Sequence, residues 1–273
     1  MRKASGAFMT LRLSDHALLD HSLYPGLAAR LPIGIMGRAF YPFRAVDSTQ
    51  NVARGLAAGG APEGTVVVAD HQTQGRGRAG RRWLAEPGAN LLVSVLLRPP
   101  IPIARVPQLS LLVSVASREA VEVQTGLPVR IRWPNDLMLD GRKVAGILSE
   151  AASSGQGLLH LVAGIGLNVN QTAFHEEIRE RATSLALATG SSRKREPLLE
   201  ALLAALNRWY RVYLEAGFGP VRSAWCQHSA TLGERVASGQ EIAGTAVDLD
   251  ADGALVVRTA SGVLKRVVAG EIQ

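Results

Sequence analysis

The sequence has 273 residues, a formal net charge of +7, and a composition that is 47% hydrophobic and 19% charged. This composition excludes a disordered, collagen-like or coiled-coil chain, and the length suffices to bury a core without disulfides. The single cysteine, Cys226, excludes an internal disulfide framework and a cysteine-rich metal site. No apolar run approaches the ~18 residues of a membrane span, and no secretory signal is recognisable. We therefore expect a soluble cytoplasmic protein.

The excess of basic residues, 30 Lys and Arg against 23 Asp and Glu, favours anionic partners such as nucleotides, nucleic acids or acidic proteins. A basic surface that only keeps the protein soluble explains the same charge equally well. A cluster of four arginines within seven positions is more specific than the overall charge. These arginines are Arg76, Arg78, Arg81 and Arg82.

The predicted elements begin after an irregular segment, residues 1–40, which prolines and glycines interrupt. The first helix starts at the N-cap run Asp47-Ser48-Thr49 and ends at the pair Gly59-Gly60. Apolar and β-branched runs then predict strands, and one long run free of Gly and Pro predicts a helix. The strands are 65–69, 90–97, 129–133, 143–150 and 158–169, and the helix is 106–124. Consecutive strands joined by short turns indicate an antiparallel or mixed sheet.

Two helices follow, at 196–215 and 220–229, and the first carries its apolar residues at the spacing of one buried face. After about Thr231 the pattern changes to short strands separated by turns at intervals of about ten residues. This pattern predicts a small all-β unit that packs on the larger domain. The predicted fold class is therefore α+β followed by a small β-barrel. Its parts are an N-terminal extension at 1–43, a main domain at 44–229 and the small domain at 230–273.

The segment 72–83, with the sequence QTQGRGRAGRRW, directly follows the first predicted strand. It contains the pattern G-x-G-x-x-G, but a dinucleotide site also needs a helix at these glycines and an acidic residue about 20 positions later. Pro87 and Gly88 prevent such a helix, and Pro100 stands where the acidic residue belongs. No Gly-Lys-[Ser/Thr] run is present either, so the segment is not a P-loop. The pattern therefore does not indicate a dinucleotide site.

Glycines that alternate with arginines indicate instead a mobile loop whose guanidinium groups can close on a phosphate or a carboxylate. Trp83 adds a flat face on which a base can stack. A solvated basic loop, or a loop that contacts nucleic acid without specificity, would explain the same residues. The hypothesis that we favour is a loop that closes over a nucleotide or another phosphate.

Three further positions place polar or small residues at the ends of predicted strands. A proline ends the strand before Asn135, whose side chain then either faces a ligand or forms an Asx-turn. Lys143 opens an apolar strand after a tight turn; its charge suits a carboxylate or phosphate, although such a lysine is usually a solvated edge residue. Gly164 and Gly166, followed by Asn168, indicate either the close approach of a ligand or a strand bulge.

No enzyme nucleophile stands out in the sequence. The histidines show no HxxxH or HExxH spacing, and no serine lies in a nucleophile elbow. Cys226 and His228 are two positions apart on a predicted helix, so their side chains do not face each other. The residues therefore favour chemistry without a covalent enzyme intermediate.

Taken together and in this order, these segments resemble the serial motifs of the biotin–protein ligases. The motifs are Asp47-Ser48-Thr49, GRGRAGRRW, RWPNDLM, GRKVAGILSE and GIGLNVN, with Val-Ala-Gly-Glu-Ile near the C-terminus. The resemblance covers about residues 44–273. It implies a catalytic α+β domain of the class II synthetase type, with a mixed sheet flanked by helices, followed by an SH3-like β-barrel.

The resemblance implies a reaction in two steps. Biotin and ATP first give biotinyl-adenylate and pyrophosphate, with Mg²⁺ as the metal. A lysine of a carrier domain, typically the biotin carboxyl carrier domain of acetyl-CoA carboxylase, then attacks the adenylate. Arg78 and Lys143 are the catalytic residues that the resemblance implies, and the metal ligands stay unassigned.

The same resemblance assigns residues to two ligand sites. The biotin site comprises Ser48, Thr49, Gln72, Arg76, Gly77, Arg78, Lys143, Gly146, Gly164 and Gly166. The ATP and adenylate site comprises Arg78, Arg81, Trp83, Asn135, Lys143 and Asn168. We expect the arginine-rich loop to lie over both.

Two alternatives remain open. Lipoate or octanoate transfer on the same fold is disfavoured because those relatives lack the arginine-rich loop. A DNA-binding regulator that responds to biotinyl-adenylate is disfavoured because the segment 1–43, which contains Pro25 and Pro32, is too short for a winged helix with a linker. We therefore expect a monofunctional bacterial ligase that binds no specific DNA and no membrane, and the resemblance is compatible with a homodimer.

Overall fold

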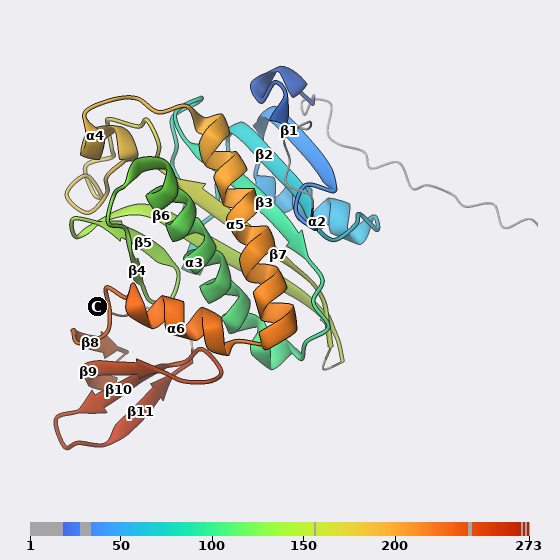
Figure 1. Cartoon of the computed structure of the whole chain (residues 1–273). Helices are drawn as coiled ribbons and strands as arrows, with labels where there is room; N and C mark the ends of the chain where they lie inside the picture. Colours follow the sequence, from blue (N-terminus) through green and yellow to red (C-terminus); the bar gives the residue numbers. More distant parts are fainter. Residues whose placement is uncertain are drawn as a thin grey trace, which may run out of the picture.

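A seven-stranded mixed sheet forms the centre of the computed structural model, which describes residues 19–27, 34–155, 157–239, 242–268, 270 and 272. The strand order is β1-β2-β3-β7-β6-β5-β4 (Figure 1). The strands are β1 (Ala39–Val46), β2 (Thr65–Gln72), β3 (Leu91–Leu97), β4 (Arg130–Arg132), β5 (Asp136–Leu139), β6 (Arg142–Ser154) and β7 (Gly157–Leu167). β1 and β2 are parallel and the other neighbours are antiparallel, so the mixed sheet that the sequence predicted is confirmed.

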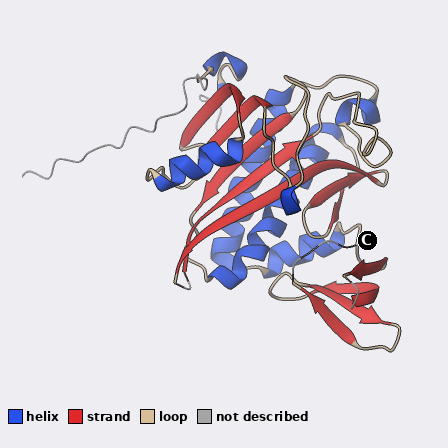
Figure 2. Ribbon diagram, turned by 180° about the vertical axis from the view of Figure 1, so that it is seen from behind, coloured by secondary structure: helices blue, strands red, loops and turns tan. Residues whose placement is uncertain are grey.

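Helices cover both faces of this sheet. In Figure 1, α3 (Val106–Thr125) and α5 (Arg195–Ala216) lie across the front face, and α6 (Gly219–Gln227) runs below them. The short helix α2 (Thr49–Ala58) lies on the opposite face, which Figure 2 shows. A further short helix, α4 (Leu185–Thr189), follows β7. Among the described residues, no helix is long and apolar enough to cross a membrane.

The protein has a hydrophobic core on each face of the sheet, and the alternation of side chains along β2 explains why one strand contributes to both. Val66 and Val68 belong to the large core under α3 and α5, whereas Val67 and Ala69 belong to the small core under α2. Because successive side chains of a strand point to opposite faces, a strand between two layers is apolar throughout. This is why the run TVVVA could be assigned to a buried strand from the sequence.

Caps define the helix that leads into the site. Ser48 is the N-cap of α2, and its side chain accepts a hydrogen bond from the Gln50 backbone N–H. The helix ends at Gly59, as the sequence predicted. The helix therefore presents its first turn to the end of β2.

The C-terminal unit is a four-stranded antiparallel sheet with the order β11-β10-β9-β8. Its strands are β8 (Arg235–Ser238), β9 (Ile242–Leu249), β10 (Leu255–Thr259) and β11 (Leu264–Val267). The small all-β unit is thereby confirmed. It packs on α3 and α6, where Gln108 donates a hydrogen bond of 2.9 Å to the Ala251 carbonyl and Arg222 pairs with both carboxylate oxygens of Asp248.

Two features differ from the sequence prediction. β1 begins at Ala39 and runs to Val46, so the predicted boundary at 43/44 falls inside a strand. Its pattern is obscured because it is an edge strand that contains Pro42 and the exposed Arg44. β5 is only four residues long, which is too short for a periodic signal. The predictions for residues 1–18 and 28–33 lie outside the described residues.

The turn between β9 and β10 allows a direct test of how the C-terminal unit is held. Gly253 has φ +89°, and a Cβ atom there would lie 2.9 Å from Leu111 Cδ1 on α3. Gly253→Ala should therefore add a steric clash to the strain of a left-handed alanine, which is about 1–2 kcal/mol. We expect it to lower Tm more than Gly262→Ala, which has the same kind of φ (+82°) and open space around it. If the two variants lower Tm by the same amount in a thermal melt, this turn does not fix the C-terminal unit.

Candidate active site

A cavity of about 790 Å³ lies over the sheet, between the first turn of α2, the segment after β2 and the ends of β5, β6 and β7. Every residue that the resemblance assigned to a ligand site lines this one cavity. They are Ser48, Thr49, Gln72, Arg76, Gly77, Arg78, Arg81, Trp83, Asn135, Lys143, Gly146, Gly164, Gly166 and Asn168. The structure thus brings the predicted residues together, and their individual roles stay predictions.

The arginine-rich segment Gly75–Trp83, called here the Gly–Arg loop, folds back on itself over the cavity. The Gly77 N–H donates to the Arg81 carbonyl at 2.8 Å, and the Trp83 N–H donates to the Gly75 carbonyl at 2.9 Å. A Cβ atom on Gly75 would lie 2.3 Å from the Trp83 carbonyl oxygen, so only glycine allows this closure. No helix opens at these glycines beyond a single 3₁₀ turn. This agrees with the sequence prediction that the segment is not a dinucleotide site.

The indole of Trp83 lies directly on the backbone of two strands. A Cβ atom on Gly166 would lie 2.5 Å from Trp83 Cε2, and one on Gly146 would lie 3.1 Å from Trp83 Cζ3. The Lys143 ammonium lies 5.7 Å from the centroid of the same indole. Trp83 Nε1 is buried without a hydrogen-bond partner among the described residues, so it is a donor that a ligand can satisfy.

Lys143 enters the cavity from the second residue of β6. The preceding turn has two left-handed residues, Asp140 (φ 49°) and Gly141 (φ 74°), as a tight hairpin between β5 and β6 requires. Its side chain is 35% exposed, and its ammonium pairs with the Asp136 carboxylate at 2.7 Å. Lys143 is therefore a cavity residue held by a partner rather than a solvated edge residue.

Arg78 reaches the cavity from the Gly–Arg loop and is half-buried. Its guanidinium donates to Asn135 Oδ1 at 3.0 Å and to the Gly270 carbonyl of the C-terminal unit at 3.1 Å. Burial lowers the pKa of Arg78, while the nearby Asp136 carboxylate acts in the opposite direction. A partly desolvated guanidinium whose hydrogen-bond partners in the described part of the chain are neutral is a favourable site for an anion.

Asn135 does not form the Asx-turn that the sequence left open. Its amide nitrogen donates to the Ile147 carbonyl, while its oxygen accepts from Arg78. Asn168 is buried, and its amide nitrogen donates to the Thr183 carbonyl at 3.0 Å. This bond ties the end of β7 to the next segment and uses one of the two N–H donors of the Asn168 amide.

A polar network lies at the end of the cavity next to α2. Gln72 Oε1 accepts from both the backbone N–H (2.7 Å) and the hydroxyl (3.0 Å) of Thr49. The Ser94 hydroxyl lies 2.9 Å from the Thr49 hydroxyl and 3.1 Å from Gln50 Oε1. These are neutral groups, so this end of the cavity suits an uncharged polar ligand group.

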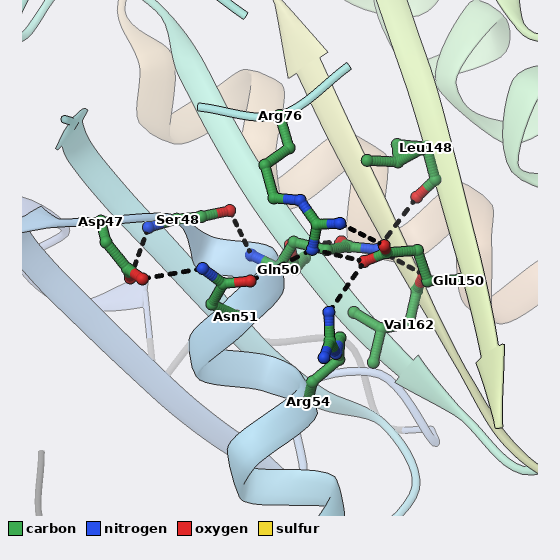
Figure 3. Close-up of polar contacts among 10 residues, drawn as sticks. Asp47, Ser48, Gln50, Asn51, Arg54, Arg76, Leu148, Glu150 and Val162 are labelled. Carbon is green, nitrogen blue, oxygen red and sulfur yellow. Dashed lines mark hydrogen bonds and ion pairs between the residues drawn. The ribbon is translucent and has the colours of Figure 1, made fainter. Parts of the chain in front are cut away.

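Gln50 is a residue of this network that the sequence reasoning missed. Its amide nitrogen crosses to the sheet and donates to the Val162 carbonyl at 2.9 Å and the Leu148 carbonyl at 3.3 Å (Figure 3). A Cβ atom on Gly164 would lie only 2.6 Å from Gln50 Oε1. Position 164 therefore has no room for a side chain, because Gln50 occupies the adjoining space. Only the assembled fold reveals this.

A second set of missed residues comes from segments without a recognisable motif. Phe174, Glu177, Ile178 and Arg181, which follow β7, line the cavity, as does Ile272 at the C-terminal end. The carbonyl of Ile272 accepts a hydrogen bond from Arg132 at 3.3 Å. The C-terminal unit therefore closes one side of the cavity.

Two family models match the chain: the Biotin/lipoate A/B protein ligase family over residues 43–168 and the Biotin protein ligase C terminal domain over residues 231–273. The bifunctional ligase/repressor BirA of Bacillus subtilis (strain 168) is 35% identical over 88% of this chain and 75% of the relative. The biotin--[acetyl-CoA-carboxylase] ligase of Paracoccus denitrificans is 35% identical over 79% of this chain and 92% of the relative. This chain belongs to the biotin protein ligase family.

Solved structures agree with this membership. The biotin protein ligase of Aquifex aeolicus in complex with biotin and ATP has a TM-score of 0.75 and 33% identity, and the match covers 86% of this chain and 98% of that one. The ligase of Leishmania major in complex with biotinyl-5-AMP has a TM-score of 0.58 and 28% identity, with 85% and 99% covered. The resemblance to the biotin protein ligases and the predicted fold class are confirmed.

For a biotin protein ligase, the packing of Trp83 on the strand glycines allows a prediction. Gly166→Ala should displace the indole from β7, and overpacking of this kind costs about 1–3 kcal/mol. We expect the Trp83 fluorescence, isolated by difference from the same variants that also carry Trp83→Phe, to shift to longer wavelength. Gly219→Ala, at a glycine with open space around it, is the matched control. An unchanged Trp83 spectrum in Gly166→Ala would contradict this packing.

Cys226 allows a test of the conclusion that no enzyme thiol takes part in the reaction. It does not line the cavity, and burial raises the pKa of its thiol, with Arg222 opposing this effect. A raised pKa leaves less thiolate at a given pH, so iodoacetamide at pH 8 should alkylate Cys226 more slowly than in the unfolded chain. We expect Cys226→Ala to keep the full ligase activity. A loss of biotin adenylation in a folded Cys226→Ala variant would be the contrary result.

Proposed function

We propose that this chain activates biotin with ATP to biotinyl-5′-adenylate and pyrophosphate, and then transfers biotin to one lysine of the biotin carboxyl carrier domain of acetyl-CoA carboxylase. The observation that carries this proposal is one cavity with two different ends. One end is lined by the neutral groups of Thr49 and Gln72, and the other by the cations Arg78 and Lys143 beside Trp83.

The two cations address the main obstacle to the first step, which is the repulsion between two anions. The biotin carboxylate has to attack the α-phosphorus of ATP, so that a carboxylate oxygen–phosphorus bond forms while the bond to pyrophosphate breaks. Arg78 and Lys143 are held in place before the substrates arrive, by Asn135 and Asp136 respectively. Preorganised cations of this kind stabilise the charge that develops in the transition state.

The neutral end of the cavity suits the ureido ring of biotin, which carries both hydrogen-bond donors and an acceptor. We assign to it Ser48, Thr49 and Gln72, together with Arg76 and Gly77. The strand glycines Gly146, Gly164 and Gly166 complete this assignment, and in the free protein they also leave room for Trp83 and Gln50. This end combines a few placed polar groups with small residues of the sheet, a composition that is common in small-molecule sites.

The cationic end suits the nucleotide. Trp83 offers its face and an unpaired Nε1 donor, and Arg78 and Arg81 come from the loop above it. Asn135 and Asn168 line the same end, where Asn135 acts by holding Arg78. Because biotinyl-adenylate is a reactive mixed anhydride, a loop that lies over it should exclude water until the carrier domain docks.

The residues present are compatible with Mg²⁺. The described residues contain no group of three His, Cys, Asp or Glu side chains that could hold a metal by themselves. Mg²⁺ usually binds through one or two carboxylates plus the phosphates of the substrate. Asp136 supplies one carboxylate inside the cavity, so Asp136 and the ATP phosphates would hold the ion. It would neutralise phosphate charge there.

The direct test of this function is to incubate the purified protein with biotin, ATP, Mg²⁺ and a purified biotin carboxyl carrier domain. We expect a biotin mass increase on one carrier lysine, and no increase on a carrier in which that lysine is replaced by arginine. If the folded protein attaches biotin to neither carrier, the proposal is contradicted. The proposal includes no specific DNA binding, so a gel-shift assay should show only salt-sensitive, sequence-independent binding.

Arg78 and Lys143 give the sharpest test of the mechanism. Lys143→Ala and Arg78→Ala should each slow biotinyl-adenylate formation roughly 10²- to 10³-fold, the usual effect of removing one transition-state charge partner. Arg211→Ala, at an exposed position of α5, is the control and should keep the full rate. Undiminished adenylate formation in either cavity variant would remove that residue from the mechanism. Arg78→Gly should in addition release free adenylate, because it loosens the loop.

A further inference from the structure

An ion-pair network lies at the base of the Gly–Arg loop and joins Arg76, which lines the cavity, to residues that do not line it. Arg76 donates two hydrogen bonds to the Glu150 carboxylate on β6, at 2.7 Å from Nη2 and 3.1 Å from Nη1 (Figure 3). Such a bidentate pair fixes direction as well as distance, since both components are planar. In the free protein, the Arg76 guanidinium is therefore directed to Glu150 on β6.

The same network reaches the helix that opens the cavity. Arg76 Nη1 also donates to Asn51 Oδ1 at 3.1 Å, and Asn51 in turn donates to Asp47 Oδ2 at 2.7 Å (Figure 3). Arg54, one turn further along α2, lies 3.8 Å from Glu150 Oε2. One carboxylate thus connects three elements: the loop, the first turns of α2, and β6.

The position of Arg76 in the chain gives this contact its importance. Arg76 stands between Gly75 and Gly77, the two glycines where the chain leaves the sheet and enters the loop. Neither glycine has a side chain that could hold this part of the loop, so the Arg76 side chain is the anchor at this point. Among the described residues, Arg76 lines the cavity and Glu150 does not, so Glu150 would act on a ligand through Arg76.

We propose that Glu150 is a positioning residue that latches the Gly–Arg loop over the cavity. This inference rests on the proposed function for its catalytic consequence, but the latch itself is a property of the free protein. Arg76 and Glu150 are 37% and 26% exposed, and ion pairs at such positions are weak enough to open. A weak latch suits a loop that has to admit two substrates and later uncover the adenylate for the carrier.

Limited proteolysis with trypsin tests the latch without any ligand. The loop presents cleavage sites after Arg78, Arg81 and Arg82, and cleavage requires an open loop. We expect Glu150→Gln and Arg76→Gln each to raise the rate of cleavage at these three sites about three- to tenfold. The effect of the double variant should be clearly smaller than the product of the two single effects, because both substitutions remove the Arg76–Glu150 pair.

A matched control is available on α3, where Glu122 pairs with Arg118 far from the loop. Glu122→Gln should leave the rate of loop cleavage unchanged, and cleavage outside the loop should be the same in all variants. Wild-type loop cleavage in Glu150→Gln would overturn the proposal. Additive effects in the double variant would overturn it as well.

The catalytic consequence is measured separately. In Glu150→Gln, we expect biotinyl-adenylate to leave the protein about three- to tenfold faster and the KM for biotin to rise, while kcat for adenylation changes little. A merely structural defect would lower kcat and Tm together. If loop cleavage is faster in Glu150→Gln but adenylate leaves the protein at the wild-type rate, the latch does not keep the adenylate in the cavity, and this part of the proposal is overturned. If wild-type protein forms no adenylate, the proposed function fails, whereas the proteolysis result for the loop still stands.

Discussion

The repulsion between a carboxylate and a polyphosphate is the physical constraint on which the rest of this structure depends. Two anions can meet in a partly desolvated cavity only if fixed positive charge is already present there. Arg78 comes from a loop and Lys143 from the start of a strand, and each needs a partner while no substrate is bound. Asn135 and Asp136 provide these partners from neighbouring positions of one short hairpin. The hairpin therefore orients both cations.

The small residues of the floor follow from the same arrangement, each for its own reason. Gly166 and Gly146 leave room for the indole of Trp83, whereas Gly164 leaves room for the amide of Gln50. A pattern of glycines within apolar strands thus reflects two different neighbours. One neighbour belongs to the Gly–Arg loop, and the other belongs to α2 on the same face of the sheet.

Local patterns allowed most of the fold to be predicted. The caps of α2, the apolar strands and the small C-terminal unit rest on residues close in sequence, and the structure confirms them. β1 escaped prediction because it is an edge strand in which Pro42 and the exposed Arg44 interrupt the apolar pattern. The ordered motifs also identified the cavity, because each motif stands at a strand end that the sheet brings to the same place.

Residues that act through distant partners could not be predicted. Gln50 is separated by 112 residues from the carbonyl of Val162 that it binds, and Glu150 is separated by 74 residues from Arg76. Neither stands in a pattern that indicates its partner. The same holds for Glu177 and Arg181, since a loop without regular structure carries no periodic signal. Such residues become visible only when the sheet order is known.

The measurement that tests the central claim most directly is biotin-dependent exchange between ATP and pyrophosphate, run with biotin, with lipoate and with neither acid. Exchange reports the attack of the carboxylate on the α-phosphorus and needs no carrier domain. A cavity built to bring the biotin carboxylate to ATP predicts exchange with biotin alone. Exchange with lipoate alone would assign the same cavity to the other branch of the family. No exchange with either acid, from a folded protein, would contradict the account.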